Sequence, residues 1–271
     1  MKRPIITLTT DWGNQSFFAG MVKGRLYSLI EDVEVVDVAH SVEPFKVAEA
    51  TFVVRNACLA FPAGTIHIVD VASDPTQENA FVVVKARGQY FICCDNGLPT
   101  MAFGHEVEEA VSIPLQEMRI YNFAAYSLFA PTAAKLAGGT PMADLGPRVE
   151  QLRQRMLPSW VSQGDEYRIP IQYIDSYGNA YLGMSYREFM DLSQGRPFMM
   201  QVREYRITEI RSSYYQKPTQ PTHRATRAGG IELCLTVSAT GMLEIAISNS
   251  NFAQYIGMQL GEMVLLQFIT R

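Results

Sequence analysis

The feature that most constrains the fold is an alternation of strand and helix signals through the first half of the chain. Runs rich in β-branched residues lie at 5–10, 33–38 and 66–71, with apolar residues at helical spacing between them. Strands are also predicted at 81–84 and 90–94, and a helix near 129–137 that ends at Gly138. Such an alternation builds a mostly parallel sheet with helices on both faces. We therefore predict an α/β domain over residues 1–160.

The second half of the chain changes to short β-rich runs separated by turn residues. The clearest runs are 233–237, 243–247 and 263–268, and one helix is expected near 186–192. This pattern is typical of a small barrel or sandwich. We predict an all-β, barrel-like domain over residues 166–271, after a boundary near 157–165 where Pro158 and Gly164 interrupt the pattern. The polar segment 216–230 is predicted to be an exposed loop.

Composition narrows the classes of partner. The chain has 23 Lys and Arg against 27 Asp and Glu, a net charge of −4, which argues against nucleic-acid binding. No apolar run approaches the ~18 residues of a membrane span, and the first apolar stretch reaches Asp11 too soon for a secretion signal. A cytoplasmic protein is expected. Charged residues are only 18% of the chain, which favours a surface partly covered by other copies of itself.

Metal and disulfide sites are not expected. The four cysteines show no CxxC pairing. Cys93 and Cys94 are adjacent in a predicted strand and are interpreted as buried apolar groups. The sequence has no glycine-rich phosphate loop and no G-x-S-x-G motif, so a dinucleotide, a nucleoside triphosphate and α/β-hydrolase chemistry are all disfavoured.

Asp11 is the first candidate site residue, because it follows the first predicted strand. Ligands of parallel sheets bind at the carboxyl ends of strands, and a carboxylate can accept two hydrogen bonds from ribose hydroxyls. The alternative is a helix N-cap, a role that Asp also favours. His40, after the second strand, is either a site residue or a turn residue, whereas His67 is interpreted as a buried strand residue.

Residues 175–179 (DSYGN) form the second candidate site. The segment is either an ordinary turn or a constellation of carboxylate, aromatic ring and amide. Such a constellation suits the ammonium and carboxylate ends of an amino acid, since Asp pairs with the ammonium and Asn can donate to the carboxylate.

Seven segments, taken in order, resemble the S-adenosylmethionine hydrolase (hydroxide adenosyltransferase) family, which includes the fluorinase and the chlorinase. Residues 8–13 (LTTDWG) are similar to its TDFG opening and residues 36–45 to its IDVTH-x-IPPF segment. The remaining matches are 61–67 with FPxGTVH, 95–98 with PDNGLL, 129–139 with FAPAAAxLAxG, 174–179 with ID-x-FGN and 243–246 with LEIA.

The resemblance implies a homotrimer whose ligand sits between the N-terminal domain of one subunit and the C-terminal domain of its neighbour. It implies that S-adenosylmethionine or adenosine is the ligand, with no further cofactor and no metal. Carried over by position, Asp11 binds the ribose and Phe45 packs near the sugar. Asp175 and Asn179 hold the methionine portion, Tyr177 stacks on the adenine, and Ser248 and Asn249 meet the adenine edge.

The family's chemistry is displacement at the 5′ carbon, with water positioned by an Asp, an Arg and a His. At the matching positions this chain has Ala72, Asn79 and Ala124, and a shift of the loop by two residues restores only Asp74. Two interpretations stay open. The chain cleaves S-adenosylmethionine to adenosine and methionine, with Asp74 assisting water, or it is a weak or inactive binding homologue. A structural trimer with a vestigial site and a halogenase are less favoured, and so is a methyltransferase.

Overall fold

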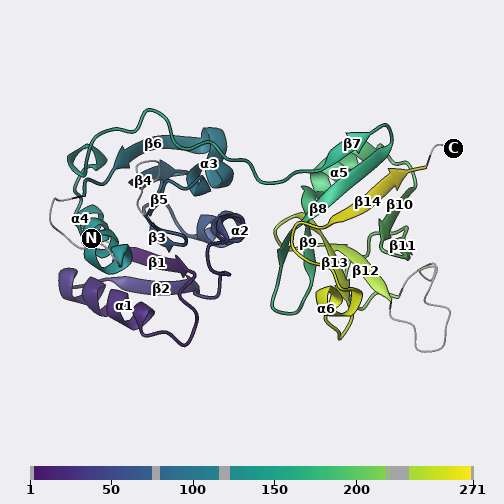
Figure 1. The fold of residues 1–271 in the computed structure, drawn as a ribbon, viewed down its shortest axis with the longest axis horizontal. Helices are drawn as coiled ribbons and strands as arrows, with labels where there is room; N and C mark the ends of the chain where they lie inside the picture. The colour runs from purple at the N-terminus through teal and green to yellow at the C-terminus, as the bar shows by residue number, and fades with distance from the viewer. Residues whose placement is uncertain (1–2, 75–79, 116–122, 218, 220–231, 270–271) are drawn as a thin grey trace. The chain divides into compact units, whose positions relative to one another are not determined.

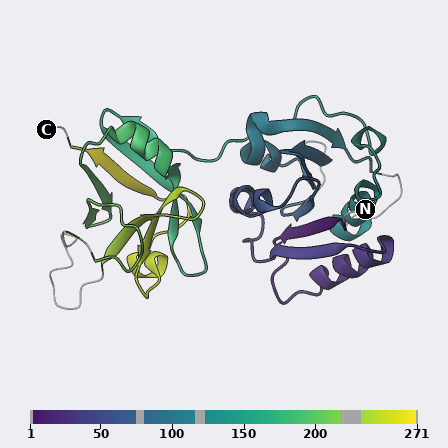
Figure 2. The same ribbon diagram turned by 180° about the vertical axis from the view of Figure 1, so that it is seen from behind.

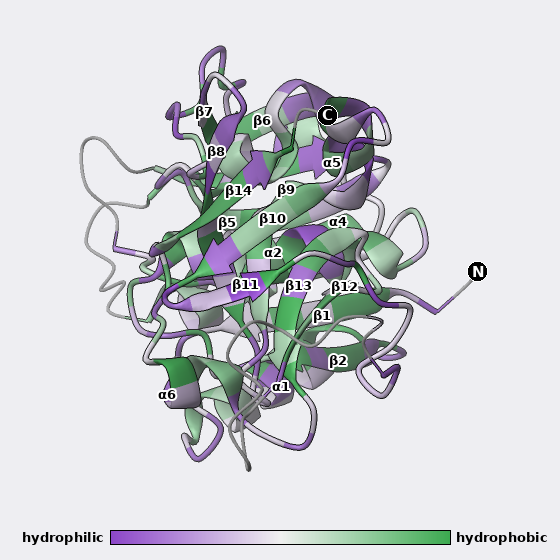
Figure 3. Cartoon of the chain, turned by 90° about the vertical axis from the view of Figure 1, so that its right-hand side faces the viewer, coloured by the Kyte–Doolittle hydropathy of each residue, from purple (hydrophilic) through white to green (hydrophobic). Residues whose placement is uncertain are grey.

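A computed structural model describes the chain except residues 1–2, 75–79, 116–122, 218, 220–231 and 270–271. The chain divides into two compact units, residues 1–156 (unit 1) and 157–271 (unit 2). In Figure 3 the strands carry stretches of hydrophobic residues, while much of the hydrophilic colour falls on loops. Most of the predicted loop 216–230 lies outside the described residues, and so does Asn79.

Unit 1 is built on a six-stranded sheet with the order β2-β1-β3-β5-β4-β6 (Figure 1). Its strands are β1 (Ile5–Thr10), β2 (Glu34–Ala39), β3 (Ile66–Asp70), β4 (Phe81–Ala86), β5 (Gln89–Cys94) and β6 (Val107–Ser112). The neighbours β2, β1, β3 and β5 run parallel, whereas β4 is antiparallel to both β5 and β6. The predicted, mostly parallel sheet is present, with an antiparallel edge that the sequence pattern did not indicate.

That edge begins with a hairpin between β4 and β5. Its turn contains Arg87 and Gly88 at φ 49° and 70°, the left-handed geometry of a tight hairpin turn. Cys93 and Cys94 lie on β5 and are buried, as the sequence predicted.

Helices cover both faces of the unit 1 sheet (Figure 1). On one face, α1 (Phe18–Leu29) and α4 (Ala130–Ala137) share a core with the π-helical turn Ala125–Phe129. On the other face, α2 (Val47–Asn56) and α3 (Leu98–Phe103) form a second core. The sheet is therefore buried on both sides, which explains the nearly continuous apolar runs in β3, β4 and β5.

Unit 2 is an eight-stranded, antiparallel, barrel-like sheet. Its strand order is β11-β10-β14-β8-β9-β13-β12, with β7 paired to β8. The strands are β7 (Val161–Gln163), β8 (Glu166–Ile174), β9 (Ala180–Ser185), β10 (Phe198–Val202), β11 (Tyr205–Ile207), β12 (Leu233–Val237), β13 (Met242–Ile247) and β14 (Met263–Phe268). A single bridge between Arg211 and Thr236 connects the segment after β11 to β12, so the sheet nearly closes on itself.

Two helices complete unit 2, α5 (Tyr186–Ser193) and α6 (Phe252–Ile256). A capping box between Ser185 and Glu188 begins α5, and Phe189 of that helix packs edge-on against Phe198 with ring centroids 5.0 Å apart. Figure 2, the view from behind, shows α5 lying over strands of unit 2. Within the described residues, no helix combines the length and the apolar character that a membrane crossing requires.

Candidate functional site

The first candidate site is a cavity of about 190 Å³ at the carboxyl ends of β1 and β3. Asp11 follows β1, Asp70 ends β3, and Thr10 lies opposite Asp70 in the parallel register. The strand order changes direction here, because β2 lies on one side of β1 and β3 on the other. This is the position at which open α/β sheets bind ligands. The cavity is lined by Asp11, Trp12, Phe18, Phe45, Asp70, Ala72, Ser73, Asp74, Phe123 and Ala124.

Asp11 ties together two loops at the mouth of this cavity. Its Oδ2 accepts hydrogen bonds from the backbone N–H of Phe45 at 3.1 Å and of Ala72 at 3.2 Å. Both of these residues have positive φ, 68° and 49°. Left-handed backbone at a non-glycine residue costs on the order of 1–3 kcal/mol, and such strain gathers at ligand sites. The N-cap alternative for Asp11 is wrong, since α1 begins only at Phe18 and has no side-chain cap.

Asp70 is the buried carboxyl of the cavity. It is 6% exposed, and its Oδ2 accepts a hydrogen bond of 2.9 Å from Trp12 Nε1. Burial raises the pKa of Asp70 to about 6, and the charges of Asp11 and Asp74 act in the same direction, while hydrogen bonds from Ser73 and Trp12 oppose them. The cavity therefore holds a carboxyl that changes charge near neutral pH.

The remaining predicted residues of unit 1 lie around this carboxyl. Asp74 is exposed and lines the same cavity. Phe45 is 72% exposed, so one side of its ring is available to a ligand. His40 is not among the lining residues, but its ring stacks on Trp12 at 5.9 Å and its Nδ1 lies 2.8 Å from Thr10 Oγ1. His67 is buried in β3 beside Thr7, as the sequence predicted.

The second candidate site is a cavity of about 720 Å³ in unit 2, beside β9 and the end of β13. Aromatic hydroxyls and amides dominate its walls. The lining residues are Asp175, Tyr177, Asn179, Tyr181, Tyr214, Tyr215, Ala246, Ile247, Ser248, Asn249 and Ser250. The cavity thus brings together the five residues of this half that the sequence singled out.

The 175–179 segment is a tight turn that also faces the cavity. Asp175 Oδ1 accepts the backbone N–H of Tyr177 at 2.9 Å and of Asn179 at 2.8 Å, and Asn179 Nδ2 donates to Oδ2 at 3.2 Å. Gly178 is required, since its φ is 82° and a Cβ there would lie 2.0 Å from Asn251 Oδ1. These bonds use three of the roughly four lone pairs of the carboxylate. A side-chain hydrogen bond with Tyr181 adds to them. The turn and site interpretations are compatible, because the carboxylate that forms the turn also lines the cavity.

Tyr177 stands at the rim of the same cavity. It is 77% exposed, so its ring is available to a planar ligand. Asn249 has φ 56°, a second case of left-handed backbone at a candidate site residue.

A buried carboxyl also lies behind the unit 2 cavity. Glu244 of β13 is 1% exposed and accepts a hydrogen bond of 2.7 Å from the Tyr214 hydroxyl. Burial raises the pKa of Glu244, the nearby Asp175 raises it further, and the Tyr214 hydrogen bond lowers it. Burial likewise raises the pKa of Tyr214 and of Tyr181, so both phenols stay protonated and able to donate.

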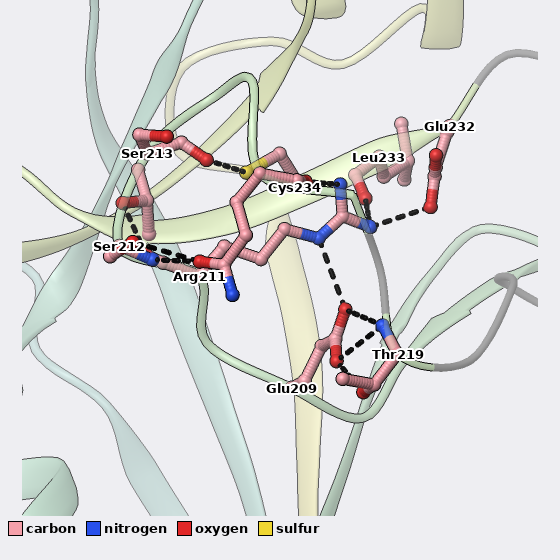
Figure 4. A network of polar contacts seen from close by, with 10 residues as sticks. Glu209, Arg211, Ser212, Ser213, Thr219, Glu232, Leu233 and Cys234 are labelled. Carbon is pink, nitrogen blue, oxygen red and sulfur yellow. Dashed lines mark hydrogen bonds and ion pairs between the residues drawn. The ribbon is translucent and has the colours of Figure 1, made fainter.

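A buried arginine anchors the segment that carries Tyr214 (Figure 4). Arg211 is 5% exposed and pairs with Glu209 at 3.2 Å and Glu232 at 2.7 Å. Its guanidinium also donates to the carbonyl of Leu233 at 3.4 Å, and its backbone N–H donates to Leu235 at 2.8 Å. These contacts fix the chain just before the two tyrosines, so the wall of the cavity depends on them.

Asp70, Glu244 and Tyr214 are among the site residues that the sequence analysis did not single out. Asp70 carried a usable signal, because it is the second-last residue of the predicted strand 66–71. Glu244 also carried a signal, since it is an acidic residue inside an apolar strand and within the 243–246 match to LEIA. Tyr214 carried none, since it lies in an irregular segment. Within the described ranges, no cluster of His, Cys, Asp and Glu is arranged to hold a metal ion.

Comparison with known proteins gives two matching family models. The model of the SAM hydroxide adenosyltransferase N-terminal domain matches residues 6–146, and that of the C-terminal domain matches residues 169–265.

Individual relatives are similar to this chain in sequence, and a solved structure is similar to it in fold. An (R)-S-adenosyl-L-methionine hydrolase of Salinispora tropica is 27% identical and covers 96% of each chain. A fluorinase of Actinopolyspora mzabensis is 28% identical over 55% of this chain and 59% of its own. The fold resembles a crystal structure of an uncharacterized conserved protein from Thermotoga maritima, with a TM-score of 0.82, 24% identity, and coverage of 97% of this chain and 99% of that one.

Proposed function

The chain belongs to the SAM hydroxide adenosyltransferase family, and from that premise we propose that it binds S-adenosylmethionine and cleaves it with water at the 5′ carbon, giving adenosine and methionine. The observation that carries this proposal is the pair of cavities. One combines carboxylates with aromatic rings at the carboxyl ends of two parallel strands, and the other is a wide pocket lined by tyrosines and amides.

Each cavity supports a different part of the ligand. Asp11 beside Phe45 suits a ribose with two hydroxyls, since a carboxylate accepts both hydrogen bonds. The Asp175–Asn179 turn suits the amino-acid end, because the Asp175 carboxylate can pair with an ammonium group and Asn179 can donate to a carboxylate. The exposed ring of Tyr177 suits stacking on adenine, and Ser248 and Asn249 offer hydrogen-bonding groups to its edge.

We further propose a homotrimer in which the unit 1 cavity of one subunit and the unit 2 cavity of its neighbour form one binding site. The low charged content of 18% supports a surface covered by other copies. In this proposal unit 1 is the nucleoside-binding domain, the protein is cytoplasmic, and the reaction needs neither a metal nor a second cofactor.

Cleavage at the 5′ carbon requires mainly that the protein align the attacking water with the ligand. The sulfonium of S-adenosylmethionine is already a good leaving group, so the site has to hold a water in line with the carbon–sulfur bond and exclude competing solvent.

A second candidate function is binding without turnover. Ala72 and Ala124 line the unit 1 cavity at two of the positions where the family resemblance expects water-handling groups. The described lining residues of that cavity include no Arg, Lys or His. Loss of such groups typically lowers a rate by ~10²–10⁴-fold.

The experiment is incubation with S-adenosylmethionine, with adenosine and methionine followed by chromatography and binding followed by calorimetry. Adenosine formation supports the hydrolase, and tight binding without products supports the binding homologue. Absence of both excludes the proposed function. Light scattering of the same sample tests the trimer, which a monomeric mass would contradict.

A further inference from the structure

The group that stands out in the unit 1 cavity is Asp70. The four residues before it in β3 are all buried, and three of them are aliphatic. A carboxyl at the end of such a strand is ordinarily compensated by a cation, because burial of an unpaired charge is costly. Here the described cavity residues supply no cation, and the donors beside the carboxyl, the Ser73 hydroxyl and Trp12 Nε1 at 2.9 Å, are both neutral.

Trp12 is itself held rigidly. Its ring stacks on His40 at 5.9 Å and meets Phe123 edge-on at 5.1 Å. The indole N–H therefore has a fixed direction. As a neutral donor, it orients the Asp70 carboxyl but does not neutralise its charge.

The three carboxylates of the cavity are not equivalent. Asp11 Oδ2 already accepts two backbone N–H groups, so this residue holds loops in place. Asp74 is exposed, and water stabilises its charge. Only Asp70 is both withdrawn from bulk solvent and in contact with the cavity. A carboxylate in that environment is a better proton acceptor than one in water, because desolvation favours its protonated form.

The titratable groups around Asp70 reinforce this property. Asp11 and Asp74 face it with like charges, and burial with these charges raises the pKa of Asp70 to about 6. Cys94 on the neighbouring β5 stays neutral, since burial raises its pKa to about 12. The His40 ring stacks on Trp12 at 5.9 Å, and its two nitrogens face Thr10 at 2.8 Å and Asp37 at 3.0 Å.

We propose that Asp70 is the catalytic base that accepts the proton of the attacking water during cleavage of S-adenosylmethionine. This inference rests on the proposed function. The water oxygen forms a bond to the 5′ carbon, and the carbon–sulfur bond breaks with its electron pair going to sulfur, which becomes the neutral thioether of methionine. The proton passes to the Asp70 carboxylate and then to solvent, so charge and atoms balance. Trp12 is the positioning residue.

The test is Asp70→Asn, which keeps the size of the side chain and an oxygen for the Trp12 N–H but cannot accept the proton. We expect kcat to fall by ~10²–10⁴-fold, while the dissociation constant of S-adenosylmethionine stays near the wild-type value. The wild-type kcat should rise with pH through about 6, and this limb should disappear in the variant.

Two further variants serve as controls. Asp95 is a buried carboxyl of the same unit that does not line the cavity, and its Oδ2 accepts a hydrogen bond of 3.0 Å from the backbone N–H of Arg153. Asp95→Asn should therefore retain kcat. Trp12→Phe removes the hydrogen bond that favours the ionised carboxyl, so the acidic limb should move to higher pH.

The outcomes separate this inference from the proposed function. Wild-type turnover that Asp70→Asn leaves unchanged, in rate and in pH profile, overturns the role of Asp70 alone. A wild-type protein that binds S-adenosylmethionine without cleaving it also overturns it, because no water is then activated. A wild-type protein that does neither removes the proposed function and this inference together.

Discussion

Both cavities have a buried carboxyl that is fixed by an aromatic donor. In unit 1 the pair is Asp70 with the Trp12 indole at 2.9 Å, and in unit 2 it is Glu244 with the Tyr214 hydroxyl at 2.7 Å. Burial raises the pKa of both carboxyls, and nearby aspartates add to the effect, Asp11 and Asp74 for Asp70 and Asp175 for Glu244.

The two carboxyls differ in how they reach their cavity. Asp70 is the last residue of a parallel strand and lines the cavity itself. Glu244 lies in the middle of β13 and meets its cavity through Tyr214. At the end of a parallel strand, Asp70 can therefore contact a ligand directly. In the barrel, Tyr214 lies between Glu244 and the cavity, so Glu244 can act on a ligand only through Tyr214.

The chain offers a way to follow each unit separately, because Trp12 lies in unit 1 and Trp160 in unit 2, and the sequence has no other tryptophan. In a Trp12→Phe background, fluorescence reports unfolding of unit 2. In a Trp160→Phe background, it reports unfolding of unit 1. The stability predictions below use these two backgrounds.

The largest effect is expected from Arg211→Gln, which breaks the anchor of the unit 2 cavity. Removal of one partner of a buried ion pair typically destabilises by ~3–5 kcal/mol. We expect a loss near the lower end of that range, because Arg211 is buried but the glutamates that lose their cation, Glu209 and Glu232, are 22% and 32% exposed. Urea unfolding of unit 2 measures this change.

The matched control is Arg203→Gln. Arg203 pairs with Glu262 at 2.6 Å on the surface, with side chains 46% and 35% exposed. Surface pairs contribute ~0–1 kcal/mol. Equal losses in the two variants would show that the Arg211 cluster is no special anchor.

The next effect is a pH-dependent stabilisation by Asp70→Asn. The folded pKa of about 6 lies above the ordinary 3.8, so the folded state binds this proton more tightly than the unfolded state. The resulting stability is present below pH ~4 and is lost as pH rises through about 6. The difference of roughly two pKa units corresponds to ~3 kcal/mol.

The variant, which lacks the titration, should therefore be more stable than wild type at pH 7.5 by up to ~3 kcal/mol and nearly equal to it at pH 4. Unfolding of unit 1 at the two pH values measures this. A variant that gains stability while it loses turnover would mark a residue retained for chemistry. A loss of stability at pH 7.5 would mean that the charge of Asp70 is compensated in the folded state.

A smaller loss is expected from Tyr214→Phe in unit 2. This change leaves the buried Glu244 without its donor, and an unsatisfied buried acceptor costs ~1–3 kcal/mol. Tyr215→Phe is the control, since Tyr215 is 75% exposed and such a change stays within about 0.5 kcal/mol. If both phenylalanine variants unfolded like wild type, the Tyr214 hydroxyl would not stabilise the buried Glu244, and the parallel with Trp12 and Asp70 in unit 1 would be wrong.

The smallest expected effect is on binding. Asp11→Ala should weaken adenosine or S-adenosylmethionine binding by at least ~1 kcal/mol, through lost hydrogen bonds to a charged acceptor and loosened loops at Phe45 and Ala72. Calorimetry measures the affinity. Asp32→Ala is the control, because Asp32 is an exposed partner of Arg3. Unchanged affinity for Asp11→Ala would remove that residue from the site.

Sequence patterns predicted most of the regular structure. β1, β12 and β14 have the predicted bounds, because turn residues flank their β-rich runs closely. The antiparallel pairing of β4 with β5 was not predicted. Two short apolar runs look alike in either direction, and only the turn at Arg87 and Gly88 decides between them.

The sequence by itself determined the family, the two-part organisation and the residues that end strands or form turns, since these are local features of pattern and motif. The environment of each carboxyl was decided by tertiary structure. The sheet register sets Asp70 beside Asp11, and the Arg211 anchor brings Tyr214 to Glu244. Burial and proton affinity depend on neighbours that are distant along the chain, and no local pattern encodes them.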